Sequence, residues 1–304
     1  MSRILACEVG FRAESATSAY AYGMTQESSA EITGSDLPSL GLLIAIAVGN
    51  SRTRVGSFAS KECLNPQSFA SSESEEIAQR VKEILDSNAD SDEEATIVLS
   101  SVHSQFADEI ERATRKAVGQ NIYRFGRDFQ IPIKHTLTEA GEMTVGQDRL
   151  LCAIGAFDQL KQACVVIDVG TAVTVDFVDG TGVFHGGAIF PGLSLMLASL
   201  HDSTSSLPKL VYRKLDPTSR EPGKQTDDAI LLGVTSAIQG AVRSLTERYA
   251  EHYQGYPKTI VTGGDMGVLE DDEVIDAFMP DLQLQGIRIA CLQLLSMEAD
   301  VDDD

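Results

Sequence analysis

The sequence is poor in basic residues and contains no tryptophan. Its 24 Lys and Arg are outnumbered by 45 Asp and Glu, which gives a formal net charge of −21. Nucleic-acid binding depends on clustered Lys and Arg, so this balance argues against a nucleic-acid partner. A small anionic substrate stays possible, because backbone amides and a few local basic groups bind anions even on an acidic protein.

Cysteine pairs and long apolar runs are also missing. The five cysteines form no C-x-x-C pair, and Cys152 and Cys164 lie in apolar runs, as buried thiols in a reducing compartment do. No run approaches the roughly 18 apolar residues of a membrane span. The first residues lack the apolar segment of a signal peptide. We therefore expect a cytoplasmic protein with no membrane partner.

The 304 residues are enough for two domains with their own cores. Residues 1–38 are rich in Ser, Ala, Thr and Glu without a sustained period, and we expect a disordered extension there. Strands then alternate with amphipathic helices, which predicts an α/β domain over 39–160. A second domain is expected over 161–298, followed by an acidic tail at 299–304.

The second domain opens with a turn that suits an anion. An apolar run from Cys164 leads to Asp168, a Gly170-Thr171 turn and a second β-rich run, which together predict a β-meander. Glycine lets backbone N–H groups approach an oxyanion, and Thr171 adds a hydroxyl. Taken alone, the pattern also fits an ordinary acidic hairpin corner.

The same design occurs about 120 residues earlier. A buried strand over 41–48 is followed by Gly49-Asn50-Ser51 and a second strand over 53–58. Two strand–turn–strand units of this kind indicate a duplicated architecture, with chance similarity of two hairpins as the alternative.

Several segments outside these turns are also expected to form regular structure. A short strand is expected over 131–134 and a helix over 150–160. Gly263-Gly264-Asp265 end a strand and are expected to open a helix, and a last helix is expected over 287–295. The predicted helix over 227–253 contains glycines that permit close packing, including packing against another subunit.

A series of motifs stands in a fixed order along the chain. They are GNS at 49–51, SSV at 100–102, GQDR at 146–149, DVGTA at 168–172, GGAIFPGL at 186–193, TSSLP at 204–208, TGGD at 262–265 and PDLQLQGIR at 280–288. In these motifs and their spacing the chain resembles the type III pantothenate kinase family, also called Bvg-accessory-factor-like.

The resemblance implies both a fold and an activity. The fold is the α/β type of acetate and sugar kinases, heat-shock chaperones and actin (ASKHA), in which two ribonuclease-H-like domains hold a nucleotide between them. The implied reaction transfers the γ-phosphoryl group of ATP to the primary hydroxyl of pantothenate, the first step of coenzyme A biosynthesis. A homodimer is implied as well, with each pantothenate site completed by the neighbouring subunit.

The resemblance also assigns roles residue by residue. Asp148 falls on the general base and Arg149 on the partner of the pantothenate carboxylate, although alone the pair would fit a helix-start acid beside a surface arginine. Asp168 falls on the ligand of a monovalent cation, K+ or NH4+, and Mg2+ accompanies ATP. The other substrate-binding positions are Gly146, Gln147 and Thr204. The nucleotide-binding positions are Ala47, Val48, Gly49, Asn50, Ser51, Arg52, Thr53, Arg54, Thr171, Gly263 and Gly264.

Two departures from the family pattern bear on activity. Position 47 is alanine where the family has an aspartate that helps to hold Mg2+ against the phosphates, which alanine cannot do. Glu139 stands where the family has a substrate-contacting tyrosine, so no role is carried over there. The alternative function is therefore a catalytically weak or silent member that binds nucleotide or regulates. Another kinase or a polyphosphate phosphatase of this fold is disfavoured by the GQDR and TSSLP motifs.

Overall fold

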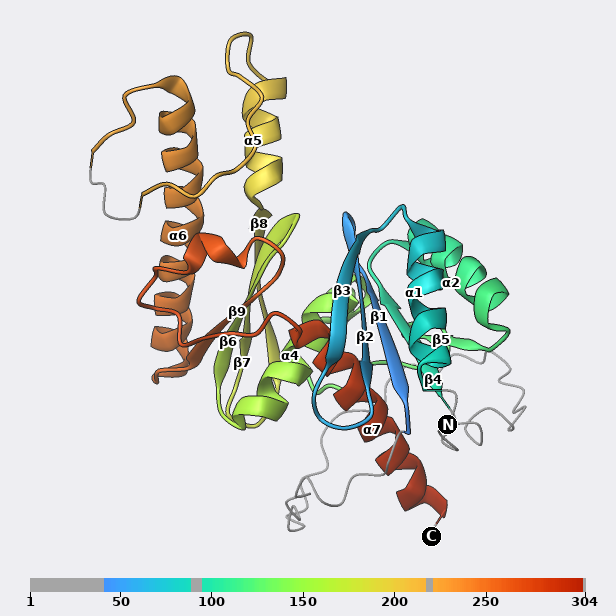
Figure 1. Ribbon diagram of the computed structural model, residues 1–304. Coiled ribbons are helices and arrows are strands. Elements are labelled where there is room, and N and C mark those ends of the chain that lie inside the picture. Colours follow the sequence, from blue (N-terminus) through green and yellow to red (C-terminus); the bar gives the residue numbers. More distant parts are fainter. Residues whose placement is uncertain (1–40, 89–94, 217–220, 303–304) are drawn as a thin grey trace.

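The computed structural model describes residues 41–88, 95–216 and 221–302 (Figure 1). The extension expected over 1–38 lies outside the described residues. Two mixed five-stranded sheets form the framework, one from each half of the chain.

The first sheet has the strand order β3-β2-β1-β4-β5. An antiparallel meander of three strands is extended by two parallel strands. The strands are β1 (Leu43–Val48), β2 (Arg52–Phe58), β3 (Leu64–Ala70), β4 (Thr96–Ser101) and β5 (Ile122–Arg124). Helices α1 (Ser74–Asp86) and α2 (Ser104–Val118) connect them and cover one face.

The second sheet repeats this plan in the order β10-β9-β6-β7-β8. Its meander and its parallel pair are arranged as in the first sheet. The strands are β6 (Cys164–Val169), β7 (Ala172–Val178), β8 (Phe184–Pro191), β9 (Lys258–Thr262) and β10 (Ala277–Phe278). The predicted duplication is therefore confirmed.

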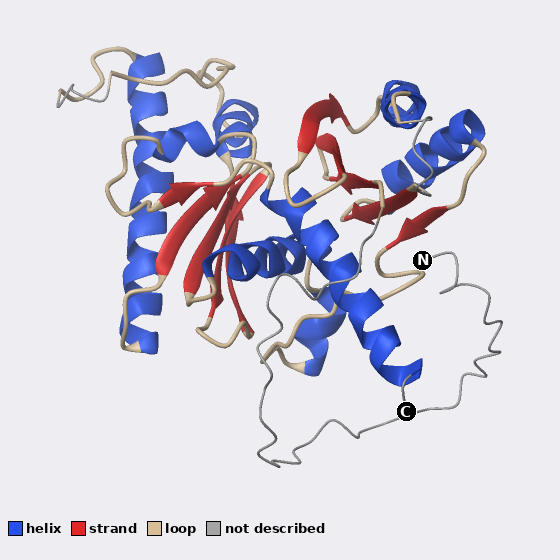
Figure 2. Ribbon diagram, turned by 60° about the horizontal axis from the view of Figure 1, so that its bottom comes forward, coloured by secondary structure: helices blue, strands red, loops and turns tan. Residues whose placement is uncertain are grey.

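Alternate residues of the central strands face different layers, as the two-residue period of a strand requires. In β1, Ile44 and Ile46 pack toward α1 and α2, whereas Ala45 and Ala47 face the opposite layer. That layer contains α4 (Gln147–Leu160) and α7 (Leu282–Asp302). Figure 2 shows these two helices between the sheets.

The two middle helices approach so closely that only glycine fits at their contact. A Cβ on Gly286 would lie 2.0 Å from the carbonyl oxygen of Leu151, and one on Gly155 would lie 2.8 Å from that of Leu282. Helix α7 falls in the range 161–298, yet it packs on the first sheet. Each half of the chain thus supplies a helix to the shared layer.

Helix α6 (Thr226–Tyr253) is the one described helix that is long and apolar enough to cross a membrane. Its residues Leu231, Val234, Ile238 and Val242 are buried in one cluster with the second sheet, so one face of α6 packs on that sheet. Helix α5 (Leu193–Asp202) and the first half of α6 extend beyond the edge of that sheet (Figure 1).

Several sequence-based boundaries were wrong. Residues 131–134 form no strand; only backbone bonds of Lys134 and Thr136 join this segment to Phe184. The helix expected after Asp265 is a short 3-10 turn, η1 (Met266–Leu269). Strand β3 and helix α3 (Glu139–Thr144) were not anticipated. Helix α7 begins before residue 287 and runs to Asp302, into the expected acidic tail.

Candidate active site

Three aspartates gather where the second sheet meets the start of α4. Asp168 lies near the end of β6 and Asp176 in the middle of β7, both on the sheet face that α4 covers. Asp148 lies in the first turn of α4, not before the helix as the expected range of 150–160 implied. Both Asp148 and Asp176 raise the pKa of Asp168, so the three charges interact.

Asp148 has the properties of a proton acceptor. Burial raises the pKa of its carboxyl, and the charge of Asp176 raises it further, against the lowering effect of Arg149. The backbone N–H of Arg149 donates to Asp148 Oδ1 at 2.8 Å, which fixes the orientation of the carboxylate. Gly146 makes room for it, because a Cβ there would lie 2.4 Å from the same oxygen. A general base works best when its pKa is closer to the working pH than that of a free aspartate.

Arg149 is held from one side only. Its Nε donates to the two carboxylate oxygens of Asp176 at 3.1 and 3.0 Å, and its Nη2 donates to the first of them. The ring of Phe184 lies under the guanidinium, 5.7 Å from its central carbon. Nη1 donates no hydrogen bond within the described residues. It also does not belong to the side-chain atoms of these residues that are both buried and without a hydrogen-bond partner. This end of the guanidinium is therefore open to solvent.

Asp168 is suited to a cation. Its carboxylate takes part in none of the hydrogen bonds found among the described residues, and it is only partly exposed. Burial raises its pKa to about 7, with further raising by Asp148 and Asp176 and a lowering by Arg54. A bound cation would lower the pKa of Asp168, because it stabilises the ionised carboxylate. Gly263, at a φ of 96°, packs so closely against this carboxylate that a Cβ at position 263 would lie 2.4 Å from Asp168 Oδ1.

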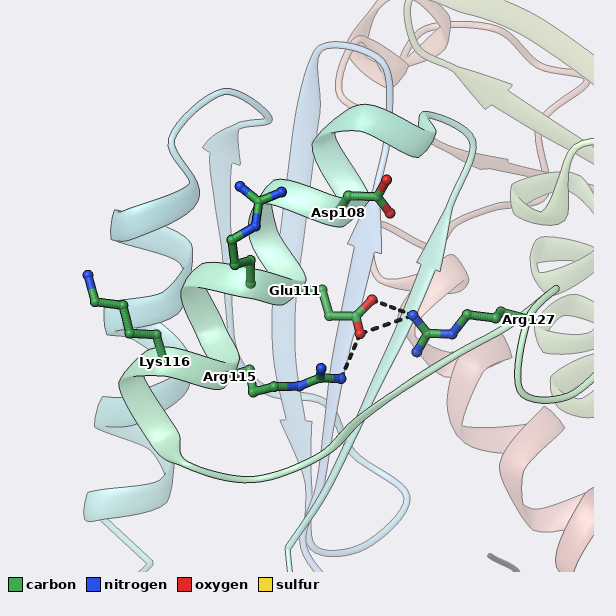
Figure 3. Close-up of a pocket in the computed structure, with 6 residues that line it drawn as sticks. Asp108, Glu111, Arg115, Lys116 and Arg127 are labelled. Atoms are coloured by element: carbon green, nitrogen blue, oxygen red, sulfur yellow. Dashed lines mark hydrogen bonds and ion pairs between the residues drawn. The ribbon is translucent and has the colours of Figure 1, made fainter. Parts of the chain in front are cut away.

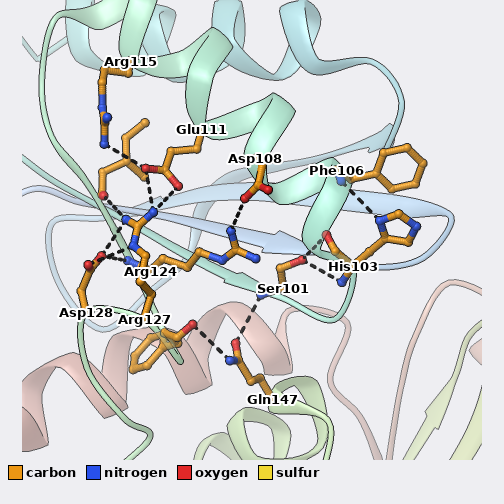
Figure 4. Close-up of polar contacts among 12 residues, drawn as sticks. Ser101, His103, Phe106, Asp108, Glu111, Arg115, Arg124, Arg127, Asp128 and Gln147 are labelled. Carbon is orange, nitrogen blue, oxygen red and sulfur yellow. Dashed lines mark hydrogen bonds and ion pairs between the residues drawn. The ribbon is translucent and has the colours of Figure 1, made fainter. Parts of the chain in front are cut away.

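The side chain of Gln147 attaches the start of helix α4 to the first sheet. Its Nε2 donates to the carbonyl oxygen of Phe125 at 3.1 Å, and its Oε1 lies 3.4 Å from both the amide nitrogen of Ser101 and the hydroxyl of Ser100. Figure 4 shows this side chain between α4, the end of β4 and the loop after β5. The structure therefore gives the Gln147 side chain a positioning task next to Asp148.

The range 47–54 separates into buried and available residues. Ala47, Val48 and Thr53 are buried within the strands, and the hydroxyl of Thr53 donates to Ser71. Arg54 is paired with Asp281 and donates to the carbonyl of Pro280. The exposed members are Asn50, Ser51 and Arg52.

The two glycine turns meet each other across 120 residues of sequence. The hydroxyls of Ser51 and Thr171 share a hydrogen bond of 2.8 Å. Within the described part of the chain, the amides of Asn50, Ser51 and Thr171 donate to no acceptor. Free amides in adjacent turns are the donors that a phosphate group requires. Gly264 also has open space around it.

Thr204 is the one expected substrate contact that lies apart. It follows α5, whose ten residues span about 15 Å, and α5 starts next to the Thr171 turn. Its hydroxyl donates to the carbonyl of Leu200 at 2.6 Å. Within one chain, Thr204 and Asp148 are not brought together.

Asp176 is the residue that sequence reasoning missed. Its side chain is 2% exposed although it carries a charge, and Arg149 compensates it. A single acid inside the β-rich run AVTVDFV was the available signal, because an unpaired carboxylate is rarely buried in a strand.

A surface pocket of about 500 Å3 lies elsewhere, on α2 (Figure 3). The buried carboxylate of Glu111 accepts from Arg127 at 2.8 and 3.0 Å and from Arg115 at 2.8 Å. These contacts tie α2 to the loop after β5, and Figure 4 shows Arg124 bonded to Asp108 beside them. We assign this cluster a stabilising role. Among the described residues, no three His, Cys, Asp or Glu side chains are arranged to hold a metal ion.

Comparison with known proteins points to one family. The type III pantothenate kinase family profile matches residues 43–248. A type III pantothenate kinase of Syntrophotalea carbinolica is 30% identical over 260 residues, covering 83% of this chain and 99% of the relative. One from Rhodopirellula baltica is 42% identical over 146 residues, covering 47% and 50%.

A solved structure supports the fold. A Baf-family protein from Campylobacter jejuni, described as a transcriptional activator, superposes with a TM-score of 0.53 at 15% identity. The match covers 83% of this chain and 99% of that one. Together with the duplicated sheets, this likeness confirms the expected α/β fold class.

Proposed function

The chain belongs to the type III pantothenate kinase family, and we propose that it phosphorylates pantothenate with ATP. The observation that carries the proposal is the pair at the start of α4. Asp148 is a buried carboxylate with a raised pKa, and the adjacent Arg149 has one guanidinium end free for a carboxylate. Two turns with unused amides supply the phosphate-binding side.

The residues divide the reaction between them. Asp148 accepts the proton of the primary hydroxyl as that oxygen attacks the γ-phosphorus, and ADP leaves. Arg149 binds the substrate carboxylate through Nη1 and Nη2, which fixes the distance between the hydroxyl and Asp148. The amides of Asn50, Ser51 and Thr171 bind phosphate oxygens.

Cations complete the charge balance in this proposal. The partner-free carboxylate of Asp168 would hold K+ or NH4+, which neutralises negative charge beside the phosphates. Mg2+ would be held by the phosphates and water, because position 47 is an apolar alanine that is 2% exposed. We place the reaction in the cytoplasm.

We also propose that two copies complete each site. Thr204 lies at the far end of α5 from its own Asp148, so a substrate contact through Thr204 requires the neighbouring chain. Helix α6 offers a surface for this, because Gly233 and Gly240 lie two turns apart with nothing within 4 Å of an added Cβ.

Mixing two inactive variants tests the shared site. Asp148→Asn and Thr204→Ala are each expected to be inactive, but a mixed dimer keeps one site with both residues intact. If dimers form at random, mixing should restore about a quarter of the wild-type activity. No recovery after subunit exchange would show that Thr204 serves its own chain or none.

A coupled assay for ADP tests the activity itself. We expect turnover that requires pantothenate, ATP and K+, and a kcat that falls about 10²- to 10⁴-fold in Asp148→Asn. The asparagine Oδ1 can still accept the Arg149 amide, so the fold should be retained. A protein that binds pantothenate but forms no phosphopantothenate at any Mg2+ or K+ concentration would refute the kinase. That result would favour a silent, nucleotide-binding member, for which Ala47 is the specific observation.

A further inference from the structure

The contact between Asp176 and Arg149 is more restrictive than an ordinary ion pair. Asp176 occupies the Nε–Nη2 edge of the guanidinium with both carboxylate oxygens. Phe184 covers one face of the same group. Together they fix both the plane and the rotation of the guanidinium, and they leave the Nη1–Nη2 end unblocked.

Asp176 is itself held rigidly. It lies in β7 between paired strands, at a register shift next to Gly187 of β8. A Cβ on Gly187 would lie 2.4 Å from Asp176 Oδ1, so glycine is required for this approach. Bulges of this kind redirect a side chain beside active sites. The side chain is 2% exposed, which keeps water from competing for Arg149.

A free arginine side chain is a poor anchor, because its rotatable bonds must be ordered each time a ligand binds. Clamping one edge removes this cost and directs the opposite end. Bidentate pairing with a carboxylate depends on the planar fork of the guanidinium, which a lysine cannot reproduce.

We propose that Asp176 is a positioning residue that orients Arg149 for a carboxylate-bearing substrate. The inference rests on the proposed kinase function and specifies its substrate recognition. Two carboxylates share the guanidinium of Arg149. Asp176 accepts from its Nε–Nη2 edge, and the substrate carboxylate accepts from its Nη1–Nη2 edge. The clamp thereby selects pantothenate over uncharged analogues.

The test compares two isosteric variants. Asp176→Asn removes the clamp. Asp272→Asn breaks a pair of similar geometry, in which Nε of the half-exposed Arg243 contacts both oxygens of the buried Asp272 carboxylate at 3.0 Å. We expect Asp176→Asn to raise the KM for pantothenate about 10- to 100-fold while kcat changes little. Asp272→Asn should change neither constant, although both variants lose stability.

The alcohol analogue of pantothenate, in which CH2OH replaces the carboxylate, separates positioning from a general structural effect. Its KM should be equal in wild type and Asp176→Asn. If Asp176→Asn does not fold, Arg149→Lys replaces it in the test. The lysine ammonium can still pair with Asp176, but it has no second guanidinium edge for the substrate. This variant should raise the KM for pantothenate and leave the KM for the alcohol analogue unchanged.

Two results would overturn the inference in distinguishable ways. A wild-type enzyme that turns over pantothenate, with a KM unchanged in Asp176→Asn or in its substitute Arg149→Lys, refutes the clamp alone. A wild-type protein that neither binds nor phosphorylates pantothenate refutes the proposed function and the clamp with it.

Discussion

Replacing Asp168 by asparagine should make the protein more stable and inactive at the same time. The pKa of Asp168 rises from 3.8 to about 7, first because the group is buried and then because Asp148 and Asp176 lie near. The folded state therefore favours the protonated acid. That stabilisation is complete below the unfolded pKa of about 3.9 and is lost as pH rises through about 7.

The size of the effect follows from the two pKa values. A pKa that is higher by about three units changes the free energy of unfolding by at most about 4 kcal/mol, at about 1.36 kcal/mol per unit. Because Asp168 is partly exposed, screening reduces this value, and we expect about 2 kcal/mol. Asparagine carries no charge, so Asp168→Asn should be the more stable protein at pH 8 by about this amount.

Urea unfolding between pH 4 and pH 8 measures this difference. The buffer contains tetramethylammonium as its cation, so that no K+ or NH4+ is present to bind Asp168. Wild type should lose stability across this window, and Asp168→Asn should lose less. Adding K+ at pH 8 should stabilise wild type and leave the variant unchanged, since only a ligand of the folded state shifts unfolding. Equal stabilities at pH 8, an equal response to K+, or near-normal kinase turnover in Asp168→Asn would refute the assignment.

Three further changes test other parts of the structure. Burial raises the pKa of Asp179, but hydrogen bonds from a histidine and from its own turn lower it to about 2. Asp179→Asn should therefore lower the free energy of unfolding by about 1 kcal/mol at pH 7. The wild-type protein should lose the same stability as the pH falls from about 4 to 2, which is the opposite pH dependence to that of Asp168. Gly286→Ala forces a Cβ against the Leu151 carbonyl and should lower the free energy of unfolding by about 1–3 kcal/mol in urea titrations. Ala47→Asp should increase kcat/KM for MgATP at a stability cost of about 1–3 kcal/mol, and Ala47→Asn should share only the cost; no gain in rate would show that the carboxylate is dispensable.

The parts of the fold that could be predicted are those whose burial is visible in the sequence. Strands β1 and β6 are buried on both faces, so their apolar runs identify them. Strand β3 is an exposed edge strand that contains Pro66, and neither its composition nor a period identifies it. Residues 131–134 look like a strand, but they make too few backbone bonds for one.

Ordered motifs mark part of the proposed site. They point to Asp148 and Asp168, and the structure places these two residues close to Asp176. Asp176 itself lies in no motif that the sequence analysis used. The tasks of Gln147 and Arg54 depend on partners far away in the chain, Phe125 and Asp281, which no local pattern indicates.

The position in the first sheet that is equivalent to Asp168 carries no carboxylate. Ala47 and Asp168 occupy equivalent positions, because each is the penultimate residue of its central strand, two residues before the turn glycine. Their neighbours across the parallel pair are Ser100 and Thr262, so the frames match while the charges differ. The first turn therefore presents amides, a hydroxyl and Arg52, whereas the second also has a carboxylate beside it. The two turns meet through Ser51 and Thr171, so in the proposed kinase one polyphosphate would bind between them, with the proposed cation at Asp168 of the second turn.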